Sequence, residues 1–211
     1  MTRKPRTLLL IAFLSGITLL APRAAFADRP GLPPLTPPPP DFETCRATGA
    51  GAICQGRRQF TEDGGPVGIF CGTSANPIEL IATPDIATQR ATRYYDRDGN
   101  LTRRVLHEDF QGTIINPATG LSVRTNQLDT LTDDLAVPGD LSAFTETSTG
   151  TLRFYLPGGG VLVHDAGLSI IGPDGTIFRE EGQHDLDAYY GQGDRSVMTA
   201  LCAALGSPGT P

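Results

Sequence analysis

The sequence has no tryptophan, and its only lysine is Lys4. Carbohydrate sites usually use flat aromatic platforms, so the missing tryptophan argues against sugar binding. Only 13 of the 17 basic residues lie after residue 27, against 23 acidic residues, so a net charge of −6 becomes −10 once residues 1–27 are removed. Nucleic acids and anionic membrane surfaces are bound through basic patches, and the balance disfavours both as partners.

Several chemical motifs are also missing. The cysteines show no C-x-x-C or C-x-x-H spacing for zinc, and no G-x-S-x-G nucleophile turn occurs. The acidic residues are many, but no motif singles out a pair for glycoside chemistry. The sequence therefore predicts no catalytic, cofactor-binding or metal-binding residue.

The first 27 residues are typical of a secretory signal peptide. Arg3, Lys4 and Arg6 precede an apolar run from Leu8 to Ala21, and small residues surround the expected cleavage site after Ala27. The apolar run is shorter than the ~20 residues that span a bilayer. We expect a secreted protein, extracellular or associated with the cell wall, with no membrane contact after cleavage.

Four cysteines in an exported chain predict disulfides, with three possible connectivities. The segment "CRATGAGAIC" is typical of a tight hairpin that turns at residues 48–51 and places Cys45 opposite Cys54. This pairing leaves Cys71 for Cys202.

The remaining chain divides into three parts. Residues 28–41, "DRPGLPPLTPPPPD", predict an unpacked proline-rich linker. Residues 42–206 contain short runs rich in Val, Ile, Thr, Phe and Tyr, separated by turn sequences, which predict one antiparallel β domain. A barrel-like core is expected, with a two-sheet sandwich as the alternative. A single helix is expected at about 195–205, with Asp194 as its cap and Gly206 after its end, and 207–211 as a disordered tail.

The three glycines of "PGGGVLVHD" raise the question of a phosphate-binding loop. Such a loop runs into a helix, but here a β-branched run follows, which predicts a hairpin instead. In that hairpin Leu156 would face Val161 and Phe154 would face Val163, with His164 pointing outward beside Arg153.

The three histidines each precede an acid, in His107-Glu108, His164-Asp165 and His184-Asp185. Consecutive residues of a strand point to opposite faces, so none of these acids can orient its own histidine, and the pattern does not favour a metal centre. The segment "DRDGN" (96–100) places oxygen-bearing residues as a calcium loop does, but lacks the glycine and the final glutamate of that loop. A hairpin turn explains it.

The layout resembles a group of uncharacterised secreted proteins of high-GC Gram-positive bacteria. The resemblance rests on the C-x₈-C hairpin, "CGT", "DGNLTRR", "PGD", "TGTL", "PGGGVLVHDAG" and the C-terminal helix with one cysteine, and covers most of 42–205. It implies a source among such bacteria and no particular activity.

The expected function is therefore a binding module for a small apolar ligand or a protein partner, because barrels of this size have room for one small ligand. A structural or surface-interaction protein of the cell envelope is the alternative. A hydrolase or isomerase with unrecognised catalytic residues is a third hypothesis. The sequence does not define the oligomeric state.

Overall fold

The computed structural model of the chain describes residues 31–185 and 196–208. Outside these residues lie the expected signal peptide, residues 28–30 of the expected linker, the expected cap Asp194 and residues 209–211 of the expected tail. Ten strands and one helix occur in the described part, namely β1 (Glu43–Thr48), β2 (Gly51–Glu62), β3 (Gly65–Thr73), β4 (Asn76–Ala82), β5 (Asp85–Tyr95), β6 (Leu101–Ile115), β7 (Ser122–Leu135), β8 (Phe144–Tyr155), β9 (Val161–Ile171), β10 (Ile177–His184) and α1 (Ser196–Ala204). None of it contains a helix with the length and apolar character needed to cross a membrane.

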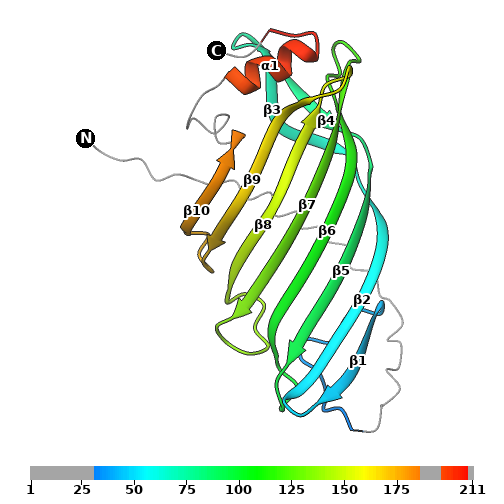
Figure 1. Ribbon diagram of the computed structural model, residues 1–211, viewed down its shortest axis with the longest axis vertical. Helices are drawn as coiled ribbons and strands as arrows, with labels where there is room; N and C mark the ends of the chain where they lie inside the picture. Colours follow the sequence, from blue (N-terminus) through cyan, green and yellow to red (C-terminus); the bar gives the residue numbers. More distant parts are fainter. Residues whose placement is uncertain (1–30, 186–195, 209–211) are drawn as a thin grey trace, which may run out of the picture.

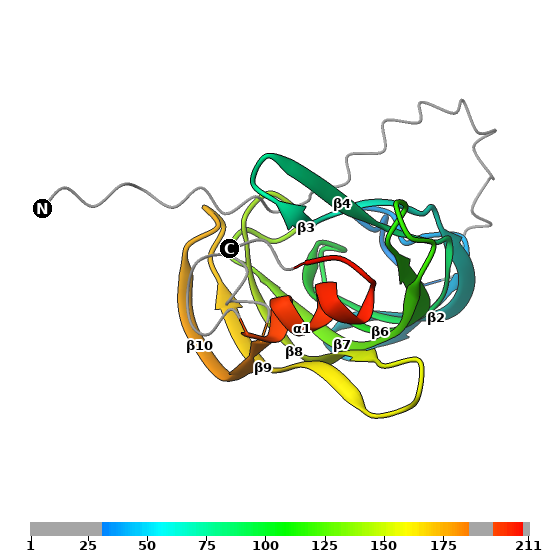
Figure 2. The ribbon, with the colours of Figure 1, turned by 90° about the horizontal axis from the view of Figure 1, so that it is seen from above.

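The strands form one antiparallel sheet, which confirms the mainly β prediction (Figure 1). Its order is β1-β2-β5-β6-β7-β8-β9-β10, and the β3–β4 hairpin joins it through β4 and β6. The sheet curls around α1, which lies across one end (Figure 2). Residues of β5–β8 therefore alternate between a concave face, turned toward the helix side, and a convex face.

The sheet is not closed into a barrel, and it does not split into a sandwich, so neither detailed arrangement was predicted correctly. The two edge strands cover different lengths of their neighbours. β1 pairs with β2 from Gly56 back to Gly51, whereas β10 pairs with β9 from Ile171 to Asp165, toward the helix end. The β10 edge carries charges and a bulge between Ile177 and Arg179, features that discourage further strand pairing.

The predicted turns are present. Cys45 pairs with Cys54 across the first hairpin, and Asp96 accepts hydrogen bonds from the amides of Asp98 and Asn100 in the β5–β6 turn. The triple-glycine segment closes the β8–β9 hairpin, with Gly159 and Gly160 at positive φ. Phe154 faces Val163 as predicted, but a bulge pairs Tyr155, and not Leu156, with Val161.

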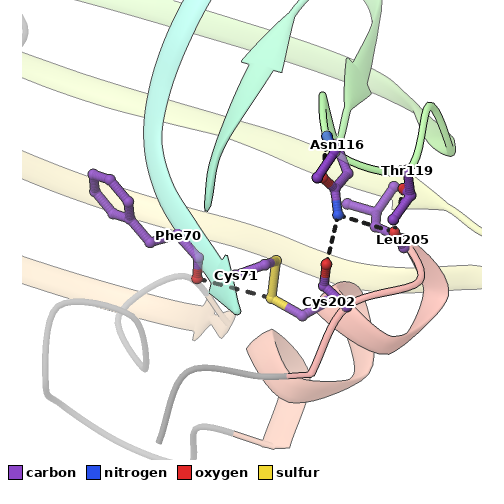
Figure 3. The surroundings of a disulfide bond; sticks show 8 residues. Phe70, Cys71, Asn116, Thr119, Cys202 and Leu205 are labelled. Atoms are coloured by element: carbon purple, nitrogen blue, oxygen red, sulfur yellow. Dashed lines mark hydrogen bonds between the residues drawn. A yellow bond between two sulfur atoms is a disulfide. The ribbon is translucent and has the colours of Figure 1, made fainter. Parts of the chain in front are cut away.

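Both predicted disulfides form, Cys45–Cys54 and Cys71–Cys202. The second ties α1 to β3, 131 residues earlier (Figure 3). Disulfides are typical of oxidising compartments, in agreement with an exported chain. Around this bond α1 packs on the concave face in one apolar cluster, whose buried members besides the cysteines are Ile69, Leu80, Ile114, Val123, Phe154, Val163, Met198, Leu201 and Leu205.

The end of the helix is held by the β6–β7 loop. The Nδ2 of buried Asn116 donates to the carbonyl of Leu205 at 3.0 Å and to Ser207 Oγ at 2.8 Å (Figure 3). Gly206 adopts the predicted left-handed conformation, with φ of 73°. Ser207 is buried and Pro208 accepts a bond from the amide of Gly72, so the expected disorder is wrong for these two residues.

Part of the predicted linker also packs. Leu32 and Leu35 contact a second apolar cluster at the other end of the sheet. The backbone of Thr36 bonds to Gly99 and Leu101, and Tyr95 Oη donates to the carbonyl of Pro37 at 2.9 Å. The expectation of an unpacked linker is therefore wrong for residues 32–37. Although this segment is rich in proline, its two leucines pack on the sheet and its backbone carbonyls at Thr36 and Pro37 accept hydrogen bonds.

Candidate functional site

The concave face carries charged residues between its two apolar ends. At one level Arg93, Arg104, Asp133 and Glu146 follow each other across β5–β8. Arg104 Nε donates to Asp133 Oδ2 at 2.5 Å, with the two side chains 24% and 2% exposed. Arg93 Nε donates to Glu43 Oε1 at 2.9 Å. The arginines that face each other are thus each neutralised by their own acid.

A second level of the concave face is also linked by hydrogen bonds. Arg58 Nε donates to Gln89 Oε1 at 2.9 Å, and Gln89 Nε2 donates to Glu108 Oε1 at 2.5 Å. The Arg58 guanidinium lies 4.3 Å from the centroid of Phe60. Next along this level, Asp129 accepts from Gln127 and stands opposite Gly150. Arg58, Glu108 and Asp129 are therefore each held by a neutral glutamine of this face.

Among the concave carboxyls, burial raises the pKa of Glu43, Asp129 and Glu146, because it disfavours their charged form. The neighbouring Asp133 raises the pKa of Glu146 further. No histidine of β5–β9 shares this face, because His107 and His164 pair with the convex residues Arg90 and Arg153. The concave face therefore carries ion pairs and carboxyls with raised pKa values, and the histidines of β6 and β9 lie on the other face.

These raised pKa values predict a pH dependence of stability. A carboxyl whose pKa is higher in the folded chain is protonated first there, so the folded state gains stability as the pH falls from 7 toward the usual value of 4.5. Glu146→Gln should raise the melting temperature at pH 7 by a few degrees, since ~1 kcal/mol corresponds to about 2–4 °C in a domain of this size. It should also weaken the pH dependence.

Thermal melts between pH 4.5 and 7.5 measure this effect. Asp140→Asn is the control, because the Ser142 hydroxyl and amide lower the pKa of exposed Asp140. A carboxyl with a lowered pKa loses its contribution to stability as the pH falls. Asp140→Asn should therefore retain the full rise in melting temperature as the pH is lowered. If the melting temperature of Glu146→Gln depended on pH as that of the wild type does, the raised pKa of Glu146 would be contradicted.

The convex face of β2 and β5–β8 contains two adjoining hollows. The first, of about 680 Å³, is lined on this face by Ile86, Gln111, Thr113, Arg124, Asn126 and Tyr155. The second, of about 530 Å³, lies further along the same strands and is lined on this face by Arg57, Thr88, Arg90, His107, Asp109, Leu128, Thr130, Thr149 and Thr151. Together they form the candidate site, named here the convex groove.

The convex groove combines cations with exposed apolar side chains. Arg57, Arg90 and Arg124 have no carboxylate within ion-pair distance in residues 31–185 and 196–208. Arg124 lies over the ring of Tyr155, 5.7 Å from its centroid. Ile86 and Leu128 are 58% and 44% exposed. Although the chain is acidic, this face is basic, because many of its acids lie on the concave side.

The predicted geometry of the histidine–acid pairs is confirmed for two of them. His107 lies on the convex face and Glu108 on the concave face, and His164 pairs with Arg153 on the convex face, away from Asp165. The side chain of His184 lies outside the described residues. The described residues contain no group of three His, Cys, Asp or Glu side chains that could hold a metal ion.

The sequence prediction missed the separation of charge between the two faces. One signal for it was present, in the consecutive arginines 103–104 and the consecutive aspartates 133–134. Arg103 and Asp134 lie on the convex face, and Arg104 and Asp133 lie on the concave face. Each arginine of β6 pairs with the aspartate opposite it on β7. Comparison with protein-family models, curated proteins and solved structures found no match for this chain.

Proposed function

We propose that this protein is a secreted binding module whose ligand is a protein partner held in the convex groove. The observation that carries the proposal is the basic, open groove on an acidic chain, with Arg57, Arg90 and Arg124 free of carboxylate partners within the described residues. Arginine and tyrosine are enriched in protein interfaces, and the arginine charges complement an acidic partner.

The character of the groove supports a protein rather than a small apolar ligand. Both hollows are open and lined mainly by polar side chains, whereas small apolar ligands are usually enclosed by apolar walls. Exposed Ile86 and Leu128 lie among these polar groups and supply the apolar contacts that an interface core requires. On the concave face Arg93 and Arg104 are already ion-paired, which favours the convex face as the binding surface for an acidic partner.

Photocross-linking in the producing organism tests the proposal. A photoreactive amino acid at Leu128, which is 44% exposed in the groove, should give a discrete protein adduct. The matched control is Leu141, which is 41% exposed in the β7–β8 connection, and we expect no such adduct there. Equal adducts from both positions, or none from Leu128, would reject the convex groove as the binding surface.

A further inference from the structure

Two arginines and a histidine lie in a row on the convex face, where Arg57 stands opposite Arg90 and Arg90 opposite His107. All three are exposed. Like charges directly opposite each other weaken a sheet. None of the three has a carboxylate within ion-pair distance in the described chain, whereas Arg103 on the same face is held by Asp134 at 2.6 Å. The row therefore places two guanidinium charges, those of Arg57 and Arg90, side by side without a carboxylate partner.

The side chains around this row leave it open to a ligand. His107 Nδ1 contacts Thr130 Oγ1 at 2.9 Å, which leaves Nε2 as the ring nitrogen available to another group. Two of the three acids that line the same hollow, Glu108 and Asp129, lie on the concave face of their strands. The third, Asp109, accepts from the side-chain amides of Gln111 and Asn126 at 3.4 and 3.3 Å. These amides belong to the first hollow, so Asp109 is engaged away from the row.

We propose that the row of Arg57, Arg90 and His107 binds carboxylates from an acidic segment of the protein partner. This inference rests on the proposed function and names the chemistry that the groove recognises. Guanidinium groups bind carboxylates through paired, charge-assisted hydrogen bonds. An extended segment presents alternate side chains on one side about 7 Å apart, so two of its carboxylates can reach two strands of the row.

The acidic segment is favoured over a sulfated polymer by the groove itself. Leu128 lies in the same hollow as the row, and Ile86 lies in the adjoining one. These exposed apolar side chains would contact the apolar residues of a protein, whereas a sulfated polysaccharide would leave them without a complementary group.

Binding of a deca-glutamate peptide to the disulfide-bonded protein at low ionic strength tests this site, with dextran sulfate and neutral dextran as the other probes. The double variant R57Q/R90Q should lose about tenfold or more in peptide affinity, as expected for removed charge-assisted hydrogen bonds. The control R103Q, on the same face, should change affinity by less than about twofold. NMR signals of the Arg57 and Arg90 Nε–Hε groups should shift with the peptide.

A second measurement separates binding from folding. Without peptide, R57Q/R90Q should melt at or above the wild-type temperature, because it removes like-charge repulsion. Unchanged peptide affinity in R57Q/R90Q, or binding of dextran sulfate alone, would overturn the site. Leu128 cross-links that survive in R57Q/R90Q would also reject this row while leaving the convex groove as the binding surface. Peptide binding at the row without any Leu128 cross-link would reject the proposed function alone.

Discussion

Replacing Cys71 and Cys202 together with serine should lower the free energy of unfolding by about 5 kcal/mol. The bond joins residues 131 apart, and chain-entropy estimates assign ~4.7 kcal/mol to a loop of about 100 residues. Since domains are stable by only about 5–15 kcal/mol, this bond accounts for a large part of the total. Both cysteines are buried among the residues that join α1 to the sheet.

The matched variant replaces Cys45 and Cys54, which are nine residues apart in the first hairpin. A loop this short contributes less, below about 3 kcal/mol. Urea denaturation of both double variants measures the difference, and limited proteolysis should release the helix only from the Cys71/Cys202 variant. Equal losses in the two variants would show that loop length does not determine the stabilisation here.

The second large effect is expected from Asp133→Ala. This substitution leaves Arg104 on the concave face without its carboxylate, and breaking a buried ion pair from one side costs about 3–5 kcal/mol. Because Arg104 is itself 24% exposed, we expect the lower end of that range. Glu146 stands opposite Asp133 on the neighbouring strand β8, and its carboxylate should replace that of Asp133 as the partner of Arg104 only in part.

Asp134→Ala is a close control, since Asp134 is the next residue and pairs with Arg103 on the convex face. That pair has a similar distance of 2.6 Å, but its side chains are 52% and 51% exposed. Exposed pairs contribute about 0–1 kcal/mol, so this variant should lose less than about 1 kcal/mol. Urea denaturation distinguishes the two, and equal losses would contradict the difference in burial between the two faces.

Local features of the fold could be predicted from the sequence because they depend on neighbouring residues. The hairpin that pairs Cys45 with Cys54, the glycine turn at 158–160 and the left-handed Gly206 all follow from turn chemistry and spacing. Once that hairpin is accepted, the remaining cysteines can only pair with each other. These predictions are confirmed in the structure.

The arrangement of the sheet could not be predicted in the same way. Closure depends on how far the edge strands overlap, and turn positions do not determine the overlap of β1 with β10. The packing of residues 32–37 depends on leucines that meet a cluster formed by distant strands. The convex groove depends on strand register, which alone places Arg57, Arg90 and His107 side by side.

The most direct test of the convex binding surface compares photoreactive probes at Gln127 and Leu128. These consecutive residues of β7 lie on opposite faces, since Gln127 stands opposite Phe110 and Leu128 opposite Asp109. We expect a protein adduct from position 128 and none from position 127. An adduct from position 127 with none from position 128 would place the partner on the concave face and contradict the account.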